Sequence, residues 1–115
     1  MGLNWTPLIE LKDFKKSEIP NSHGVYKIFN SYRNLIYIGQ SKKISNRLSY
    51  QIQKLNLLEP NLLFSYCIFD NDILDFQLKE IENDLIGSFS FKINSPPKYQ
   101  FANMKTLEIR CNLKN

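Results

Sequence analysis

Hydrophobic residues recur along the chain at two different spacings. Residues 24–30 ("GVYKIFN") and 35–40 ("LIYIGQ") are rich in β-branched and aromatic side chains, and residues 31–33 ("SYR") separate them. This pattern predicts a β-hairpin. A third run of the same character, residues 62–69 ("LLFSYCIF"), predicts a third strand.

Two longer segments show the three-to-four-residue spacing of amphipathic helices. The first is expected to begin after Ser41, as its N-cap, and to run to about Leu55. The second is expected to begin within residues 70–72 ("DND") and to run to about Ser88. The apolar positions expected to face the core are Ile44, Leu48, Ile52 and Leu55 in the first helix, and Leu74, Leu78, Ile81 and Leu85 in the second.

The remaining segments complete one predicted domain over residues 1–115. Residues 6–19 suggest a capping segment with a short helix, and the two prolines of residues 93–101 ("INSPPKYQF") favour an extended or turning chain. Residues 104–112 ("MKTLEIRCN") alternate as a short edge strand would. The order hairpin, helix, strand, helix predicts an α+β fold with a small three-stranded antiparallel sheet flanked by helices.

Charge is spread unevenly between the two halves of the chain. The net charge is +4, and residues 1–60 carry nine Lys and Arg against four Asp and Glu. A basic first half suggests a polyanionic partner, although a solvated surface also explains such an imbalance. No signal peptide or membrane-spanning stretch is recognised, so a cytoplasmic protein without a membrane partner is expected. The spacing of Cys67 and Cys111 favours free thiols.

The predicted hairpin holds two tyrosines whose relation depends on the turn. If Ser31 and Tyr32 form a two-residue turn, Tyr26 and Tyr37 lie directly opposite each other. They would then be either a structural pair or part of a site. Gly39 adds to the second reading, because a glycine within a strand often marks a close approach to the backbone.

Polar residues on the two helices extend the candidate site. Lys43, Arg47, Tyr50 and Lys54 form a stripe on the first helix. A solvated basic face would explain Lys43 and Lys54, whereas Arg47 could reach the sheet face that holds the tyrosines. On the second helix, Glu82 borders the apolar stripe, where a carboxylate lies at the rim or is partly buried with a partner. Glu80 and Asp84 are expected to point to solvent.

Together these residues resemble the GIY-YIG nuclease family. The chain has "GVY" at 24–26 and "YIG" at 37–39, Arg47 ten positions after Tyr37, and Asn94 twelve positions after Glu82. The resemblance covers about residues 22–95. The stretch "IYIGQSKKISNRL" is most similar to the N-terminal catalytic domain of the bacterial nucleotide-excision-repair incision nuclease.

The resemblance implies a DNA endonuclease that hydrolyses phosphodiester bonds with one Mg²⁺ or Mn²⁺ ion per site. Glu82 would be the metal ligand, Arg47 would hold the scissile phosphate, and Asn94 would support the site. Tyr26 and Tyr37 would line it, one of them orienting or deprotonating the attacking water. Gly24 and Gly39 would serve as supporting backbone. The residues expected to contact DNA are Lys42, Lys43, Arg47, Tyr50 and Lys54, with specificity supplied by a second copy of the chain or by a partner protein.

Two positions depart from the family pattern. Relatives often have Lys after the second glycine, where this chain has Gln40, and Lys42 or Lys43 could substitute. Relatives also have His or Tyr four positions after the arginine, where this chain has Gln51 with Tyr50 beside it. These departures concern the rate and the proton transfer more than the activity itself. The alternative function is a catalytically weak or inactive nucleic-acid-binding module, or a regulatory subunit, that kept the fold.

Overall fold

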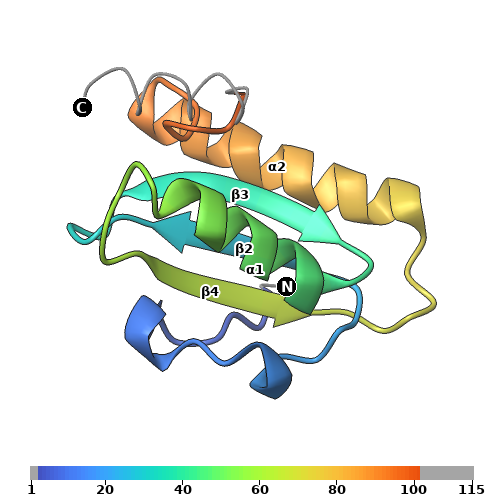
Figure 1. The fold of residues 1–115 in the computed structure, drawn as a ribbon. Coiled ribbons are helices and arrows are strands. Elements are labelled where there is room, and N and C mark those ends of the chain that lie inside the picture. The colour runs from blue at the N-terminus through green and yellow to red at the C-terminus, as the bar shows by residue number, and fades with distance from the viewer. Residues whose placement is uncertain (1–2, 102–115) are drawn as a thin grey trace.

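A four-stranded antiparallel sheet lies at the centre of the fold, with strands in the order β1-β4-β2-β3. Figure 1 labels β4, β2 and β3, which lie side by side. The computed structural model describes residues 3–101. Its elements are β1 (Ile9–Glu10), the 3₁₀ turns η1 (Leu11–Asp13) and η2 (Lys16–Glu18), β2 (Gly24–Phe29), β3 (Leu35–Ser41), α1 (Ile44–Leu55), β4 (Leu63–Ile68) and α2 (Asp75–Ile93). The predicted α+β class and the order of the main elements are confirmed.

The sheet has four strands, so the predicted count of three is wrong. The additional strand is β1, which pairs with β4 through Ile9 opposite Phe64 and Glu10 opposite Leu63. A strand of two residues has no alternation that a sequence pattern could show. The short helix predicted within residues 6–19 is present only as the two 3₁₀ turns.

The hairpin does not have the register that a two-residue turn at Ser31 and Tyr32 would give. Tyr26 lies opposite Gly39, and Tyr37 lies opposite Ile28, so the two tyrosines are offset along the strands. An offset of two residues keeps both side chains on the same face of the sheet.

The connection between β2 and β3 explains this register. It is longer than two residues, and the Asn30 side chain organises it by accepting hydrogen bonds from the backbone N–H groups of Tyr32 and Asn34, each at 3.0 Å. Arg33 takes a left-handed conformation with φ of 66° within the same loop. The Asn30 side chain thus replaces a two-residue turn with a wider one, a choice that the apolar pattern does not encode.

Both helices begin later than predicted. The N-cap of α1 is Lys43 rather than Ser41, although the Ser41 Oγ accepts a hydrogen bond from the Lys43 N–H at 3.0 Å. The N-cap of α2 is Leu74 rather than a residue of 70–72, and the Gln77 Oε1 accepts a hydrogen bond from the Leu74 N–H at 2.9 Å. A glutamine thus satisfies a backbone donor that an aspartate was expected to serve.

The helix ends agree with the prediction in one case only. The first helix, α1, ends at Leu55 as predicted. The second, α2, continues past Ser88 to Ile93, and Asn94 closes it with a φ of 66°. Prolines follow directly, which explains why the helix ends here and why the chain turns afterwards, as expected.

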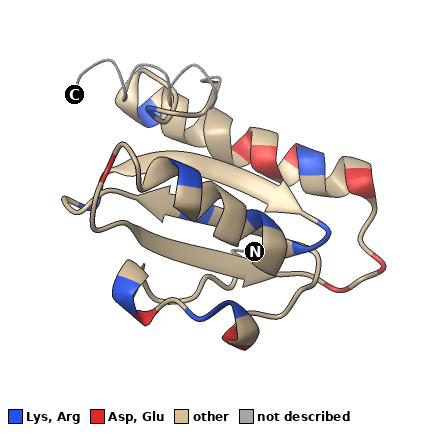
Figure 2. Cartoon of the chain, in the orientation of Figure 1, with Lys and Arg blue, Asp and Glu red and all other residues tan. Residues whose placement is uncertain are grey.

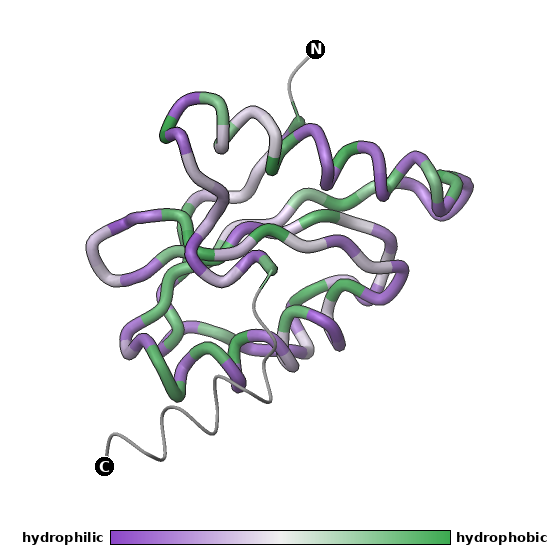
Figure 3. Tube along the Cα trace, turned by 90° about the horizontal axis from the view of Figure 1, so that it is seen from above, coloured by the Kyte–Doolittle hydropathy of each residue, from purple (hydrophilic) through white to green (hydrophobic). Residues whose placement is uncertain are grey.

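Hydrophobic side chains are buried on both faces of the sheet. All four predicted core positions of α1 are buried against the face that carries Tyr26 and Phe64. On the opposite face, Val25 and its cross-strand partner Cys67 pack with Leu78 of α2, and Ile81 and Leu85 lie beside them. Leu74 precedes α2 and is exposed, contrary to prediction. Hydrophobic and hydrophilic positions alternate along both helices (Figure 3).

The chain after α2 returns along the outer edge of β3. The backbone N–H of Tyr99 donates to the Ile36 carbonyl at 3.0 Å. The Gln100 side chain both accepts from the Ile38 N–H and donates to the Ile38 carbonyl, each at 2.8 Å. This arrangement fixes Gln100 beside the strand that carries Tyr37.

Two predictions concern residues outside the described range. The expected edge strand at 104–112 lies there, and so does Cys111; Cys67 is a free, buried thiol. Within residues 3–101, neither helix has the length and apolarity needed to cross a membrane.

Candidate active site

Four elements converge on one cavity of about 310 Å³. Strands β2 and β3 supply Tyr26 and Tyr37, α1 supplies Arg47, and α2 supplies Glu82. The complete lining is Tyr26, Tyr37, Gly39, Gln40, Arg47, Lys79, Glu82, Asn83, Ile86, Gln100 and Phe101. Four of the five residues predicted to be catalytic therefore meet in one place, although they are widely separated in the sequence.

The two tyrosines form a stacked pair over a glycine. Their ring centroids are 6.1 Å apart with an interplanar angle of 29°. Tyr26 is fully buried, and a Cβ atom added to Gly39 would collide with its ring. The close approach that Gly39 indicated is therefore made by the Tyr26 side chain.

Burial controls the ionisation of both phenols. It raises the pKa of Tyr26 and of Tyr37 above the usual value of about 10, and the positive charge of Arg47 acts in the opposite direction on both. The Tyr26 hydroxyl is buried without a hydrogen-bond partner among the described residues. Both side chains are therefore neutral at pH 7, and the Tyr26 hydroxyl has unused hydrogen-bonding capacity beside the cavity.

Gln51, rather than Tyr50, contacts the tyrosine pair. The Gln51 Nε2 donates to the Tyr37 hydroxyl oxygen at 3.4 Å, and Gln51 is only 3% exposed. Tyr50 is 47% exposed, and the charged groups of Arg47 and Lys54 lie 5.8 and 5.7 Å from its ring centroid. Tyr50 thus belongs to the outer surface of α1.

In the part of the chain that the structure describes, Glu82 is the single carboxylate that lines the cavity, and it is buried with a partner. The residue is 9% exposed, and its Oε1 lies 3.0 Å from the Nζ of Lys79, one turn earlier in α2. Glu80 and Asp84 are exposed, as predicted. Neither of these two carboxylates lines the cavity, so neither could replace Glu82 there as a ligand or a charge.

Asn94 and the predicted DNA-contacting lysines lie outside this cavity. Asn94 is exposed at the end of α2 and does not line it. Lys42 and Lys43 line an adjacent hollow that shares Arg47, and the Lys42 Nζ lies 2.9 Å from the Asp75 Oδ2. Figure 2 shows basic residues on α1 and acidic residues along the first half of α2.

Gly24 does not line the cavity, and packing between elements explains its position. A Cβ atom here would meet the backbone carbonyl of Cys67 and the side chain of Ile44. Gly24 thus allows β2 to approach β4 and α1 closely. It supports the site only indirectly.

Five cavity residues were not predicted: Lys79, Asn83, Ile86, Gln100 and Phe101. Lys79 precedes Glu82 by three positions, so helical spacing alone could have placed the two on one face. Gln100 reaches the cavity only because the chain folds back along β3, and no local signal in the sequence indicates this.

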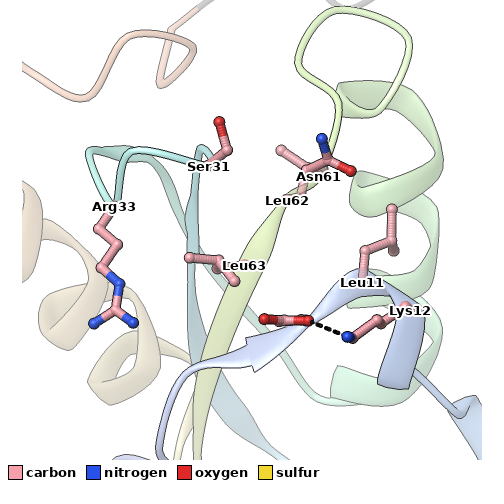
Figure 4. Close-up of a pocket in the computed structure, with 8 residues that line it drawn as sticks. Leu11, Lys12, Ser31, Arg33, Asn61, Leu62 and Leu63 are labelled. Atoms are coloured by element: carbon pink, nitrogen blue, oxygen red, sulfur yellow. Dashed lines mark ion pairs between the residues drawn. The ribbon is translucent and has the colours of Figure 1, made fainter.

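A larger hollow of about 430 Å³ lies elsewhere, between the β2–β3 loop and the start of β4 (Figure 4). It is lined by Glu10, Leu11, Lys12, Ser31, Arg33, Asn61, Leu62 and Leu63. The Lys12 Nζ lies 3.1 Å from Glu10, and both side chains are mostly exposed. The smaller cavity is the better candidate site because it combines buried polar groups with the tyrosine pair.

The side chains of the cavity offer a small set of oxygen ligands for a metal ion. Among residues 3–101 there is no group of three or more His, Cys, Asp or Glu side chains that could hold one. Glu82 offers one carboxylate, and the nearby side chains of Tyr37, Gln40 and Asn83 offer neutral oxygens. Such a donor set fits a hard cation such as Mg²⁺ or Mn²⁺, which keeps several water ligands.

Sequence comparison finds several similar proteins, all named UvrABC system protein C. Two from strains of Prochlorococcus marinus are 31% identical over 101 residues and 32% identical over 110 residues, covering 80% and 84% of this chain. One from Rickettsia bellii is 28% identical over 88 residues, covering 74% of the chain. The matches span only 16%, 17% and 14% of the relatives' own lengths. No protein-family model matches the chain.

Proposed function

Because most of this chain is similar to a segment of UvrABC system protein C, we propose that it is a nuclease domain that hydrolyses phosphodiester bonds in DNA with the help of a divalent metal ion. One observation carries the proposal: a single cavity brings together Tyr26, Tyr37, Arg47 and Glu82. These are four of the five positions through which the sequence resembles the GIY-YIG nucleases.

Arg47 is suited to hold the scissile phosphate. Its guanidinium can donate two parallel hydrogen bonds to phosphate oxygens. It is exposed on α1 while still lining the cavity, so DNA can reach it.

Hydrolysis places additional charge on the non-bridging oxygens of the phosphate. A fixed cation such as the Arg47 guanidinium stabilises that charge more in the transition state than in the ground state.

Glu82 is the residue that would hold the metal ion. A bound Mg²⁺ or Mn²⁺ ion would neutralise charge on the phosphate and acidify a coordinated water. The Glu82 side chain is nearly buried, so its carboxylate has little freedom to move away from the cavity. Neutral oxygen donors around it would leave the remaining positions to water and phosphate.

The two tyrosines differ in what they can do. Tyr26 is fully buried and neutral, so it would act as a hydrogen-bond donor toward the phosphate or the attacking water. Tyr37 is less buried, and its oxygen already accepts a hydrogen bond from Gln51. That hydrogen bond stabilises negative charge on the Tyr37 oxygen, so Tyr37 is the better candidate to lose its own proton beside Arg47 and a bound metal ion, and then to receive a proton from water as the phenolate.

The outer face of α1 would bind the DNA backbone. Lys43 is exposed beside Arg47, and the Tyr50 ring lies between the charges of Arg47 and Lys54. Contacts of this kind position DNA without reading its sequence. A second copy of the chain or a partner protein would then supply specificity.

Plasmid cleavage tests the proposal. The full chain is incubated with supercoiled plasmid in Mg²⁺ or Mn²⁺, with EDTA as the metal-free control. We expect nicked and linear DNA with metal only, and no cleavage by Glu82→Gln. The matched control is Glu80→Gln, which changes an exposed carboxylate on the same helix and should cleave like the original chain. Cleavage by Glu82→Gln at the original rate would remove Glu82 from the site.

The second candidate is a nucleic-acid-binding module without catalysis. The ion pair between Glu82 and Lys79 favours it, because a carboxylate held by an ammonium group is satisfied without a metal. Salt-sensitive DNA binding combined with no cleavage under any metal condition would support this alternative.

A further inference from the structure

The cavity holds two cationic side chains and one carboxylate. Arg47 and Lys79 both line it, and among residues 3–101 Glu82 is the only acidic residue that does. The Lys79 Nζ lies 3.0 Å from the Glu82 Oε1, which is within hydrogen-bond distance. Lys79 is therefore the direct partner of the carboxylate that the proposed function assigns to the metal.

The two members of this pair differ in mobility. The Lys79 side chain is 60% exposed, whereas that of Glu82 is 12% exposed. A lysine has four flexible methylene groups and a compact ammonium group, so it can leave a partner without any backbone movement. Glu82 is held by the helix and its surroundings, so any exchange of partners must occur on the lysine side.

A metal ion and an ammonium group are both attracted by the charge of the same carboxylate. A carboxylate oxygen can accept a hydrogen bond and coordinate a metal ion at once, so Lys79 does not exclude metal by occupying Oε1. A divalent ion bound to Glu82 at about 2.0 to 2.2 Å would nevertheless lie close to the Lys79 Nζ, which is 3.0 Å from Oε1, and the two positive charges would repel each other. Movement of the ammonium group away from Glu82 would therefore favour metal binding.

We propose that Lys79 is an exchangeable counter-ion of Glu82 and sets the affinity of this site for divalent metal. Without metal, Lys79 neutralises the nearly buried carboxylate. When metal binds, the ammonium group moves away along its exposed stem. The inference rests on the proposed function for the identity of the metal site, and it assigns to Lys79 a positioning role rather than contact with the reacting atoms.

Metal binding measured without DNA tests this exchange. Mn²⁺ is titrated into the full chain by isothermal titration calorimetry, and bound Mn²⁺ is counted independently by electron paramagnetic resonance. The variants are Lys79→Met, which keeps the aliphatic stem and removes the charge, and Lys79→Arg, which keeps the charge. Lys15→Met is the matched control, because Lys15 pairs with Glu18 at the same i,i+3 spacing, 3.8 Å apart and away from the cavity.

We expect Lys79→Met to bind Mn²⁺ about three- to tenfold more tightly, because one ion pair and one nearby positive charge are removed. The Mn²⁺ affinities of Lys79→Arg and Lys15→Met should stay within about twofold of that of the original chain. Lys79→Arg keeps the positive charge beside Glu82, and Lys15→Met removes only an exposed ion pair, which contributes little energy. Mn²⁺ binding that is detected for Lys79→Met but not for the original chain would also support the exchange.

An unchanged or weaker affinity in Lys79→Met would overturn the inference, and so would the absence of Mn²⁺ binding by every variant. Plasmid cleavage separates this result from the proposed function. A chain that cleaves with Mg²⁺ while Lys79→Met leaves Mn²⁺ affinity unchanged would retain the nuclease function and refute only the role of Lys79.

Discussion

Replacing Gly39 with alanine should destabilise the protein through one specific collision. Gly39 lies on β3 directly opposite Tyr26 on β2, and a Cβ atom there would overlap the Cζ and hydroxyl atoms of the Tyr26 ring. The ring cannot move aside easily, because it is fully buried and stacked on Tyr37.

The expected magnitude combines two opposing effects. Overpacking of a buried side chain costs about 1 to 3 kcal/mol. Replacing a glycine within a strand returns about 0.5 to 1 kcal/mol of conformational entropy. The net loss for Gly39→Ala therefore falls between about 0 and 2.5 kcal/mol, and the close overlap with a ring that cannot move places the expected value in the upper half of that range.

Gly87 provides a matched control of opposite sign. It lies within α2, and a Cβ atom there would meet no atom within 4 Å. Gly87→Ala should stabilise the protein by about 0.5 to 1 kcal/mol, because alanine is the better helix former and nothing is displaced. Urea unfolding followed by far-ultraviolet circular dichroism gives both free energies of unfolding from the same assay.

A second mutation identifies the colliding group. Leucine lacks the outer ring atoms, so Gly39→Ala should cost little in a Tyr26→Leu background, and the double-mutant cycle should show a coupling of about 1 kcal/mol or more. If Gly39→Ala alone is as stable as the original chain, the collision is not real. If its cost is unchanged in the Tyr26→Leu background, the Tyr26 ring is not its cause.

Three further predictions concern the candidate site. Tyr37→Phe should fold normally but slow plasmid cleavage by roughly 10²-fold, measured as the rate of nicking, since it removes the proposed proton acceptor. Arg47→Ala should lose far more cleavage activity than Lys54→Ala, because only Arg47 lines the cavity; equal losses would indicate a diffuse electrostatic surface. Burial raises the pKa of Tyr26 in the folded state, so stability is fully present below pH 10 and should fall above it, by up to about 1.4 kcal/mol per pH unit for this group. Urea unfolding at pH 8 and pH 11 should show a shallower decline for Tyr26→Phe, and an identical decline would contradict the buried, neutral phenol.

Sequence patterns predicted those parts of the fold that repeat regularly. The apolar positions of α1 and the alternating residues of β2 and β4 have enough repeats to determine element type and facing. The register of the hairpin was left open by the sequence, because hydrogen bonds to the side chain of Asn30 organise the loop and no periodicity indicates them. The starts of both helices were missed for local reasons. Ser41 does accept a hydrogen bond from the Lys43 N–H, but α1 begins two residues later than a Ser41 cap predicts, and the Leu74 N–H before α2 bonds to Gln77 rather than to an aspartate of residues 70–72.

The candidate site was predictable to the extent that its residues belong to regular elements. Tyr26, Tyr37, Arg47 and Glu82 project from two strands and two helices, so their order and spacing carried the resemblance. Gln100 could not be found in this way, because its place depends on how the chain packs after α2. The contact between Lys79 and Glu82 follows from their i,i+3 spacing on a helix, so the sequence of α2 was sufficient to predict it.

The return of residues 97–101 along β3 also bears on self-association. An edge strand with free N–H and C=O groups is a template onto which a strand of another molecule can add, the first step of β-aggregation. Here the outward backbone groups of Ile36 and Ile38 are already bonded to Tyr99 and Gln100. The opposite edge is β1, which offers only two residues. Neither edge of the sheet therefore presents a long, vacant row of backbone groups, and the domain can keep a strand as apolar as β3 at its margin without polymerising through it.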